Sequence, residues 1–93
     1  MEAFFDLHPH AEYSIPVQGQ FCRIVLNMWP PNPDQPVFVY GVPRDGGARE
    51  CVGTIRFVQG PSFGKPALLF RSQPYSELVL WAEEPAEGRV YFD

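Results

Sequence analysis

The sequence contains little of what catalytic, metal-binding and membrane proteins usually need. It has only two histidines and two cysteines in 93 residues. Its longest unbroken apolar run, Leu78 to Ala82, is far shorter than the roughly 20 residues that cross a bilayer. Met1 and Glu2 open the chain without the basic segment and the apolar stretch of a secretory signal. We therefore expect a cytoplasmic protein with no membrane partner.

Cationic side chains are also few, and they are scattered along the chain. Seven Lys and Arg residues stand against eleven Asp and Glu residues, for a net charge of −4. A protein that binds nucleic-acid phosphates needs a basic stripe, because each phosphate contact requires a cation. The acidic residues cluster only at Glu83, Glu84 and Glu87, too sparsely to imitate the phosphates of DNA. We expect an acidic protein that does not bind nucleic acid.

Apolar residues are abundant enough for one core. The chain is 45% hydrophobic and 15% aromatic, which excludes general disorder. A chain of this length builds a single core and no more. No repeat or shift in composition divides it, so residues 1–93 are interpreted as one domain.

Eleven prolines and eight glycines fall mainly between the apolar runs and divide the chain into short segments. Such segments are too short for ordinary helices and are typical of strands. The expected strands cover residues 3–7, 13–17, 21–28, 37–42, 50–58, 67–71, 77–82 and 89–92. This pattern predicts an all-β fold, a small antiparallel β-sandwich or barrel of six to eight short strands.

Two of these segments alternate between apolar and polar residues. In 21–28 the residues expected to be buried are Cys22, Ile24, Leu26 and Met28, opposite Arg23 and Asn27. In 50–58 the expected buried residues are Cys51, Ile55 and Phe57, with Gly53 as the sign of a bulge or a close crossing. Both cysteines are therefore predicted to be free, buried thiols.

The connections carry turn signals. Asp45-Gly46 predicts a hairpin between 37–42 and 50–58. Pro85 to Gly88 is interpreted as a second hairpin, joining 77–82 to 89–92. Residues 72–84 could also form a helix capped at Ser72, but a helix would leave Leu80 and Trp81 exposed, so a strand is favoured.

One segment carries side chains that bind metals. In an extended chain Asp6, His8, His10 and Glu12 would project to one side, and imidazole with carboxylate suits zinc, nickel or iron. The acid follows His10 by two residues rather than the three or four typical of cupins, and there is no third histidine. A solvent-exposed polar loop is the favoured interpretation, so we expect no metal and no cofactor, with His8 and His10 as the weak alternative.

Other signs of an enzyme are weak. No serine stands in a Gly-x-Ser-x-Gly turn, and both cysteines lie on faces expected to be buried. We therefore expect no enzymatic activity.

Aromatic residues in stiff, proline-rich loops are more informative. Trp29 lies beside four prolines at 30, 31, 33 and 36, and such loops lose little entropy when they bind. Trp and Tyr are also frequent in interface hot spots. We name Trp29, Phe63 and Tyr75 as the binding residues, with Arg44 and Arg71 on the rim, although Trp29 could instead cap the core.

These observations predict a non-catalytic protein-interaction module: an adaptor, an inhibitor or an assembly subunit, of bacterial or phage origin. It would bind another protein through its loops or a strand edge, or dimerise through an edge or an apolar face. The first alternative is a β-sandwich that binds a small ligand or a carbohydrate. The second is a metal-dependent enzyme that uses His8 and His10.

Overall fold

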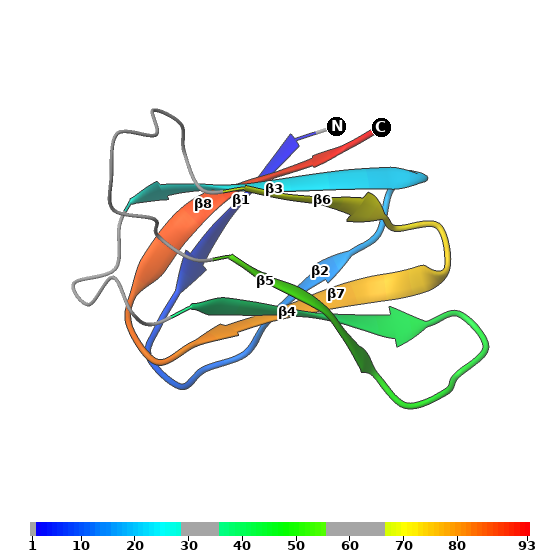
Figure 1. The fold of residues 1–93 in the computed structure, drawn as a ribbon, viewed down its shortest axis with the longest axis horizontal. Helices are drawn as coiled ribbons and strands as arrows, with labels where there is room; N and C mark the ends of the chain where they lie inside the picture. The colour runs from blue at the N-terminus through cyan, green and yellow to red at the C-terminus, as the bar shows by residue number, and fades with distance from the viewer. Residues whose placement is uncertain (1, 29–35, 56–66) are drawn as a thin grey trace.

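The computed structural model describes residues 2–28, 36–55 and 67–93, and the predicted all-β fold is confirmed (Figure 1). It has eight strands: β1 (Glu2–Leu7), β2 (Tyr13–Pro16), β3 (Phe21–Met28), β4 (Val37–Pro43), β5 (Glu50–Ile55), β6 (Ala67–Arg71), β7 (Tyr75–Ala82) and β8 (Ala86–Phe92). No helix in these ranges could cross a membrane.

The strands form two antiparallel sheets that pack face to face as a sandwich (Figure 1). Sheet A has the order β1-β8-β3-β6, and sheet B has the order β2-β7-β4-β5. Of the described strands, β4 and β5 are the only two that follow one another in the chain and also pair in a sheet. Every other connection passes from one sheet to the other, so each sheet combines strands that are distant in sequence.

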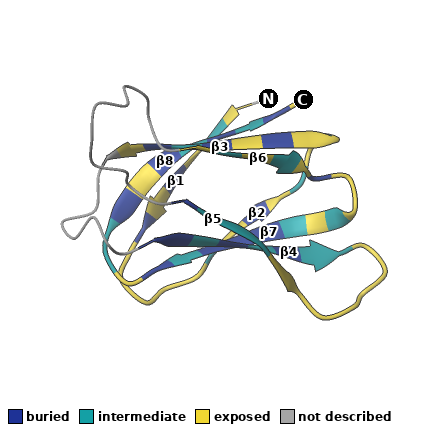
Figure 2. Cartoon of the chain, viewed as in Figure 1, coloured by how far each residue is buried: buried dark blue, intermediate teal, exposed yellow. Residues whose placement is uncertain are grey.

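The core lies between the sheets, and buried residues alternate with less buried ones along several strands of both (Figure 2). The alternation predicted for β3 is confirmed, since Cys22, Ile24 and Leu26 are buried while Arg23 and Asn27 are exposed. The side chains that are almost inaccessible come from six strands, among them Leu7, Ile24, Leu26, Val37, Val39, Ile55, Leu78, Leu80 and Val90. Period-two burial of this kind explains why the short apolar segments form strands.

The hairpin predicted at Asp45-Gly46 is confirmed between β4 and β5. Gly46 has a φ of +83°, a conformation that glycine adopts without steric cost. The Asp45 carboxylate accepts a hydrogen bond from the Gly47 amide at 2.9 Å, which closes the turn. The strand favoured over a helix for residues 72–84 is also confirmed, as β7.

The second predicted hairpin is wrong. β7 belongs to sheet B, whereas β8 begins at Ala86 and pairs with β1 and β3 in sheet A. Gly88 therefore lies in a central strand rather than a turn. A Cβ there would collide with the Val25 carbonyl and the Phe5 ring, so this glycine permits close packing.

The predicted burial of Cys51 is also wrong, because its side chain is exposed. The β4–β5 register shifts between Val39, paired with Gly53, and Tyr40, paired with Cys51. The extra residue between these pairs is Val52, which packs against the core. The bulge expected at Gly53 is thus present, and it changes which residue of β5 points inward. Met28 and Phe57 have side chains outside the described part.

Candidate functional site

Half of the side chains of sheet A point outward, away from the core. We call this surface the sheet A face. Its members are Glu2, Phe4 and Asp6 on β1; Glu87, Arg89 and Tyr91 on β8, with Asp93 just beyond; Phe21, Arg23, Val25 and Asn27 on β3; and Ala67, Leu69 and Arg71 on β6.

The sheet A face carries all three large apolar side chains that are highly exposed in the described ranges. Phe4 is 63% exposed, Phe21 is 55% exposed and Leu69 is 73% exposed. They come from β1, β3 and β6, and the strand order brings them onto one surface. Single exposed apolar residues are normal on a protein surface, but several on one face indicate an interaction site.

Two arginines of the sheet A face lie over aromatic rings. The Arg23 guanidinium is 4.5 Å from the centre of the Tyr91 ring, and that of Arg89 is 4.7 Å from the centre of the Phe4 ring. In the described ranges the only ion pair made by either group is that of Arg89 with the Glu2 carboxylate, at 3.7 Å. The Nε of Arg89 is covered and has no hydrogen-bond partner there. These cations are therefore held mainly by rings, not by carboxylates.

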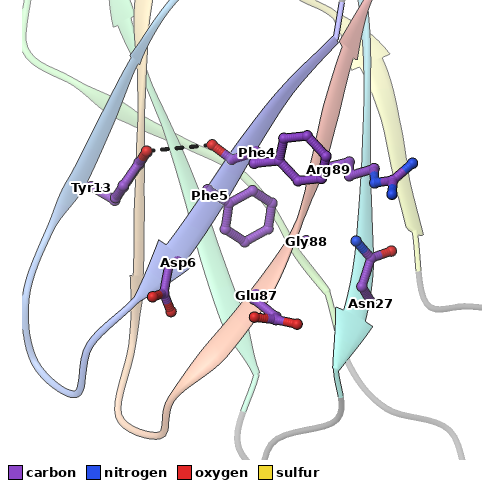
Figure 3. Close-up of a pocket in the computed structure, with 8 residues that line it drawn as sticks. All are labelled: Phe4, Phe5, Asp6, Tyr13, Asn27, Glu87, Gly88 and Arg89. Carbon is purple, nitrogen blue, oxygen red and sulfur yellow. Dashed lines mark hydrogen bonds between the residues drawn. The ribbon is translucent and has the colours of Figure 1, made fainter.

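Two shallow hollows mark the same sheet. The larger, of about 380 Å³, is bordered by Phe4, Phe5 and Tyr13, with Asp6 and Glu87 side by side on neighbouring strands (Figure 3). The Tyr13 hydroxyl donates a hydrogen bond to the Phe4 carbonyl at 3.3 Å, which joins sheet B to the edge of sheet A. The smaller hollow, of about 300 Å³, is lined mainly by Phe21, Arg23, Leu69, Tyr91 and Asp93.

The outer face of sheet B is also aromatic, but its rings cover one another. The Trp81 ring lies 5.6 Å from Phe38 and 5.8 Å from His10, and Phe38 stacks on Tyr40 at 6.4 Å. All three ring-bearing strand residues are partly buried.

An ion pair crosses this aromatic surface. The Arg49 guanidinium lies 5.2 Å from the centre of the Tyr40 ring and contacts the Glu12 carboxylate at 2.7 Å. The hydrogen bond from Arg49, assisted by its charge, holds the pKa of Glu12 below its usual value. This arginine already has its carboxylate partner.

Three of the five predicted binding residues lie around one turn. The Arg44 Nε donates to the Gln73 carbonyl at 2.8 Å, and the Arg71 guanidinium donates to Gln73 Oε1 at 2.6 Å. The Tyr75 ring packs over the Gly41 backbone, and its hydroxyl donates to a Glu50 carboxylate oxygen at 2.6 Å. Tyr75 therefore closes this end of the core, and Arg71 belongs to the sheet A face.

The other two predicted binding residues, Trp29 and Phe63, lie outside the described residues. The strand ends that flank them, Met28, Val37, Ile55 and Ala67, lie at the end of the sandwich opposite Tyr75. The described strands alone do not bring the five predicted residues together.

The segment from His8 to Glu12 is the exposed polar loop favoured from the sequence, and it lacks the extended arrangement that the weak metal-binding alternative required. β1 ends at Leu7, and His10 has a φ of +63°, so the chain turns instead of remaining extended. His10 lies against Trp81 and Glu12 is paired with Arg49. Across residues 2–28, 36–55 and 67–93 no three His, Cys, Asp or Glu side chains are grouped to hold a metal ion.

The two free cysteines differ in reactivity. Burial raises the pKa of the Cys22 thiol to about 12, so it stays protonated and unreactive at neutral pH. Cys51 lies opposite Tyr40 on the outer face of sheet B, where its thiol is exposed.

Sequence reasoning did not single out the sheet A face as a site, although part of its signal was present. Phe21 and Val25 stand on the same side of β3 as Arg23 and Asn27, so the polar side of that strand was never fully polar. Nothing in the sequence showed that Phe4 and Leu69 would join them, because this depends on β8 and β3 lying between β1 and β6.

Comparison with protein-family models and with curated proteins finds no match for this chain. Its function is therefore inferred from the chemistry of the site itself.

Proposed function

We propose that this chain is a non-catalytic protein-interaction module that binds through the sheet A face. The observation that carries the proposal is the gathering of Phe4, Phe21 and Leu69, all highly exposed, on one sheet. Burying apolar surface is the main favourable term in most protein association. Such a face gives a partner protein that surface to cover.

The neighbouring residues support the same proposal. Arginine and tyrosine are enriched in interfaces and in their hot spots, and Arg23 and Tyr91 stand together near the centre of the face. Arg23 is already held over the ring, so it loses less side-chain entropy when a partner binds. These contacts support a binding surface on the strands, in addition to Trp29 and Phe63, which the sequence predicts.

Site-specific photo-crosslinking tests the proposal. A photo-crosslinking amino acid replaces Leu69 on the sheet A face or, as the matched control, Ser14 on the outer face of sheet B. After irradiation in an extract of the source organism, we expect a protein adduct from position 69 and not from position 14. Adducts from both positions alike, or from neither, would contradict the proposal.

A second candidate function rests on the larger hollow. Its volume of about 380 Å³ falls in the range of small-ligand sites, and it combines the Phe4 and Tyr13 rings with the Asp6 and Glu87 carboxylates (Figure 3). This combination suits a carbohydrate, whose rings stack on aromatics and whose hydroxyls donate to carboxylates. Titration with a glycan panel tests it. Saturable binding that Asp6→Asn and Glu87→Gln remove would favour this function over protein binding.

A further inference from the structure

The charges of the sheet A face divide along the strands. Its carboxylates lie on the side of β1 and β8: Glu2, Asp6, Glu87 and the terminal Asp93. The side of β3 and β6 carries Arg23 and Arg71 and no carboxylate. Arg89 on β8 is the one cation on the acidic side, and it already lies near Glu2. The face therefore has an acidic half and a basic half.

The strand register gives this division a definite geometry. Glu2, Tyr91, Arg23 and Leu69 form one row across the sheet, and Phe4, Arg89, Val25 and Ala67 form the next. The paired residues Phe21 and Arg71 stand beyond the first row, towards the end of the sheet that carries Asp93.

A twofold axis parallel to the strands, between β8 and β3, would place the acidic half of one copy on the basic half of another. β1 would then face β6 of the second copy, so Glu2 would meet Leu69 and its neighbour Arg71. The large Phe4 ring would meet the small Ala67 side chain. Such an interface is self-complementary in charge and in size, as twofold symmetry requires.

We propose that a second copy of this chain binds the sheet A face in this face-to-face arrangement. The inference rests on the proposed function and names its partner. It assigns a role to Arg23 and Arg71, which have no carboxylate partner among the described residues, since both would lie near the second copy's carboxylates. It also explains why the exposed apolar residues lie among charges of both signs.

The size of the sheet A face indicates how tightly two copies should bind each other. Four strands about 4.8 Å apart and five to eight residues long give a patch of roughly 20 by 20 Å, on the order of 400 Å² in projection. Stable interfaces bury about 800 Å² per partner. The patch is about half of that area, in the size class of weak and transient complexes, so we expect a weak dimer that forms at micromolar or higher concentrations.

A charge exchange tests the geometry. In the proposed dimer, position 2 of one copy lies near position 71 of the other. Glu2→Arg therefore brings two cations together when the variant pairs with itself, and Arg71→Glu brings two carboxylates together. When the two variants are mixed, a heterodimer sets the new arginine at position 2 of one chain near the new glutamate at position 71 of the other. Both positions are exposed, so the fold should tolerate the changes. The matched control is Ser14→Arg on the outer face of sheet B.

Sedimentation velocity on untagged protein, from about 1 to 500 μM, measures the outcome. We expect the wild type and the control to dimerise alike, each single variant to dimerise at least about tenfold more weakly, and the mixture to regain a heterodimer. A wild-type dimer insensitive to both variants, or a mixture without heterodimer, would refute this arrangement.

A wild type that remains monomeric up to 500 μM would refute the second copy as the partner. The proposed function would then be judged separately by the adduct from position 69. An adduct with a different protein retains that function, and the absence of any adduct refutes both.

Discussion

The two outer faces of the sandwich are built from similar residues. They differ in how many contacts the side chains of those residues make within the chain. Each has an arginine over a tyrosine ring, Arg49 over Tyr40 on sheet B and Arg23 over Tyr91 on sheet A. Arg49 also contacts a carboxylate at 2.7 Å, and the rings beside it pack on one another. Arg23 has no carboxylate partner among the described residues, and Phe21 and Leu69 near it are exposed.

The difference shows that aromatic content alone does not identify a binding surface. On sheet B the aromatic residues contribute to the stability of the monomer, because their contacts are made within the chain. On sheet A the same residue types leave contacts unmade, which a partner would complete. An aromatic face that stabilises the monomer is therefore distinguished from an interaction face by how exposed its side chains are and by whether they have partners within the chain.

The largest expected difference is in the stability lost when a phenylalanine of each face is replaced by alanine. Phe38→Ala removes a ring that contacts Tyr40 and Trp81, and it should lower the free energy of unfolding by about 2 kcal/mol. Phe21→Ala removes an exposed ring and should cost less than about 0.5 kcal/mol. Urea unfolding of both variants measures these costs. Equal costs would show that the two faces do not differ in this way.

A smaller difference is expected between the two arginines. Arg49→Gln frees Glu12 and uncovers Tyr40, so the melting temperature should fall, by less than in Phe38→Ala. Arg23→Gln should leave the melting temperature nearly unchanged and weaken association. Thermal unfolding at a fixed dilute concentration keeps the monomers comparable. A larger fall for Arg23→Gln would reverse the assignment of the faces.

The ion pair on sheet B also predicts a pH dependence. Because Arg49 lowers the pKa of Glu12 in the folded protein, the unfolded chain binds the proton more tightly. The stabilisation is therefore fully present above the unfolded pKa, near 4.5, and is lost as the pH falls through the folded pKa. The stability difference between wild type and Glu12→Gln should be constant near neutral pH and shrink below about pH 5. Urea unfolding across this range measures it, and a difference that grows on acidification would contradict the assignment.

The smallest expected effect comes from Cys51. A maleimide should react with this exposed thiol in the folded protein and with Cys22 only after unfolding, as mass spectrometry of the adducts would show. Because Cys51 lies on the outer face of sheet B, a bulky maleimide there should not change the dimer constant. The same label on Leu69→Cys, in a Cys51→Ser background, should abolish dimerisation. A loss of dimer on labelling Cys51 would place the interface on sheet B.

Local patterns predicted most of the strands correctly and only part of their arrangement. The bounds of β3 and β6 match those expected, because alternation in β3 and proline punctuation act over a few residues. Cys51 was misassigned because an extra residue in a bulge reverses the inward side beyond it, and the partner strand decides where that happens. Pro85 to Gly88 was misassigned because a sharp connection between sheets has the same turn residues as a hairpin.

The candidate site was less predictable than the fold. Phe4, Phe21 and Leu69 are separated by long stretches of chain, and each alone resembles an ordinary exposed residue. The position of Tyr75 over Gly41 was equally hidden, because these residues lie on different strands.

The sequence by itself determined that this chain is all-β, where most strands run, and which side of β3 faces the core. These properties depend on side-chain spacing within single segments. Only the tertiary structure decided that β1, β8, β3 and β6 share one sheet, and hence that the exposed apolar residues and the two halves of opposite charge lie on one face. Backbone hydrogen bonding between strands is available to any strand, so pairing is chosen by packing of the whole core, which no single segment encodes.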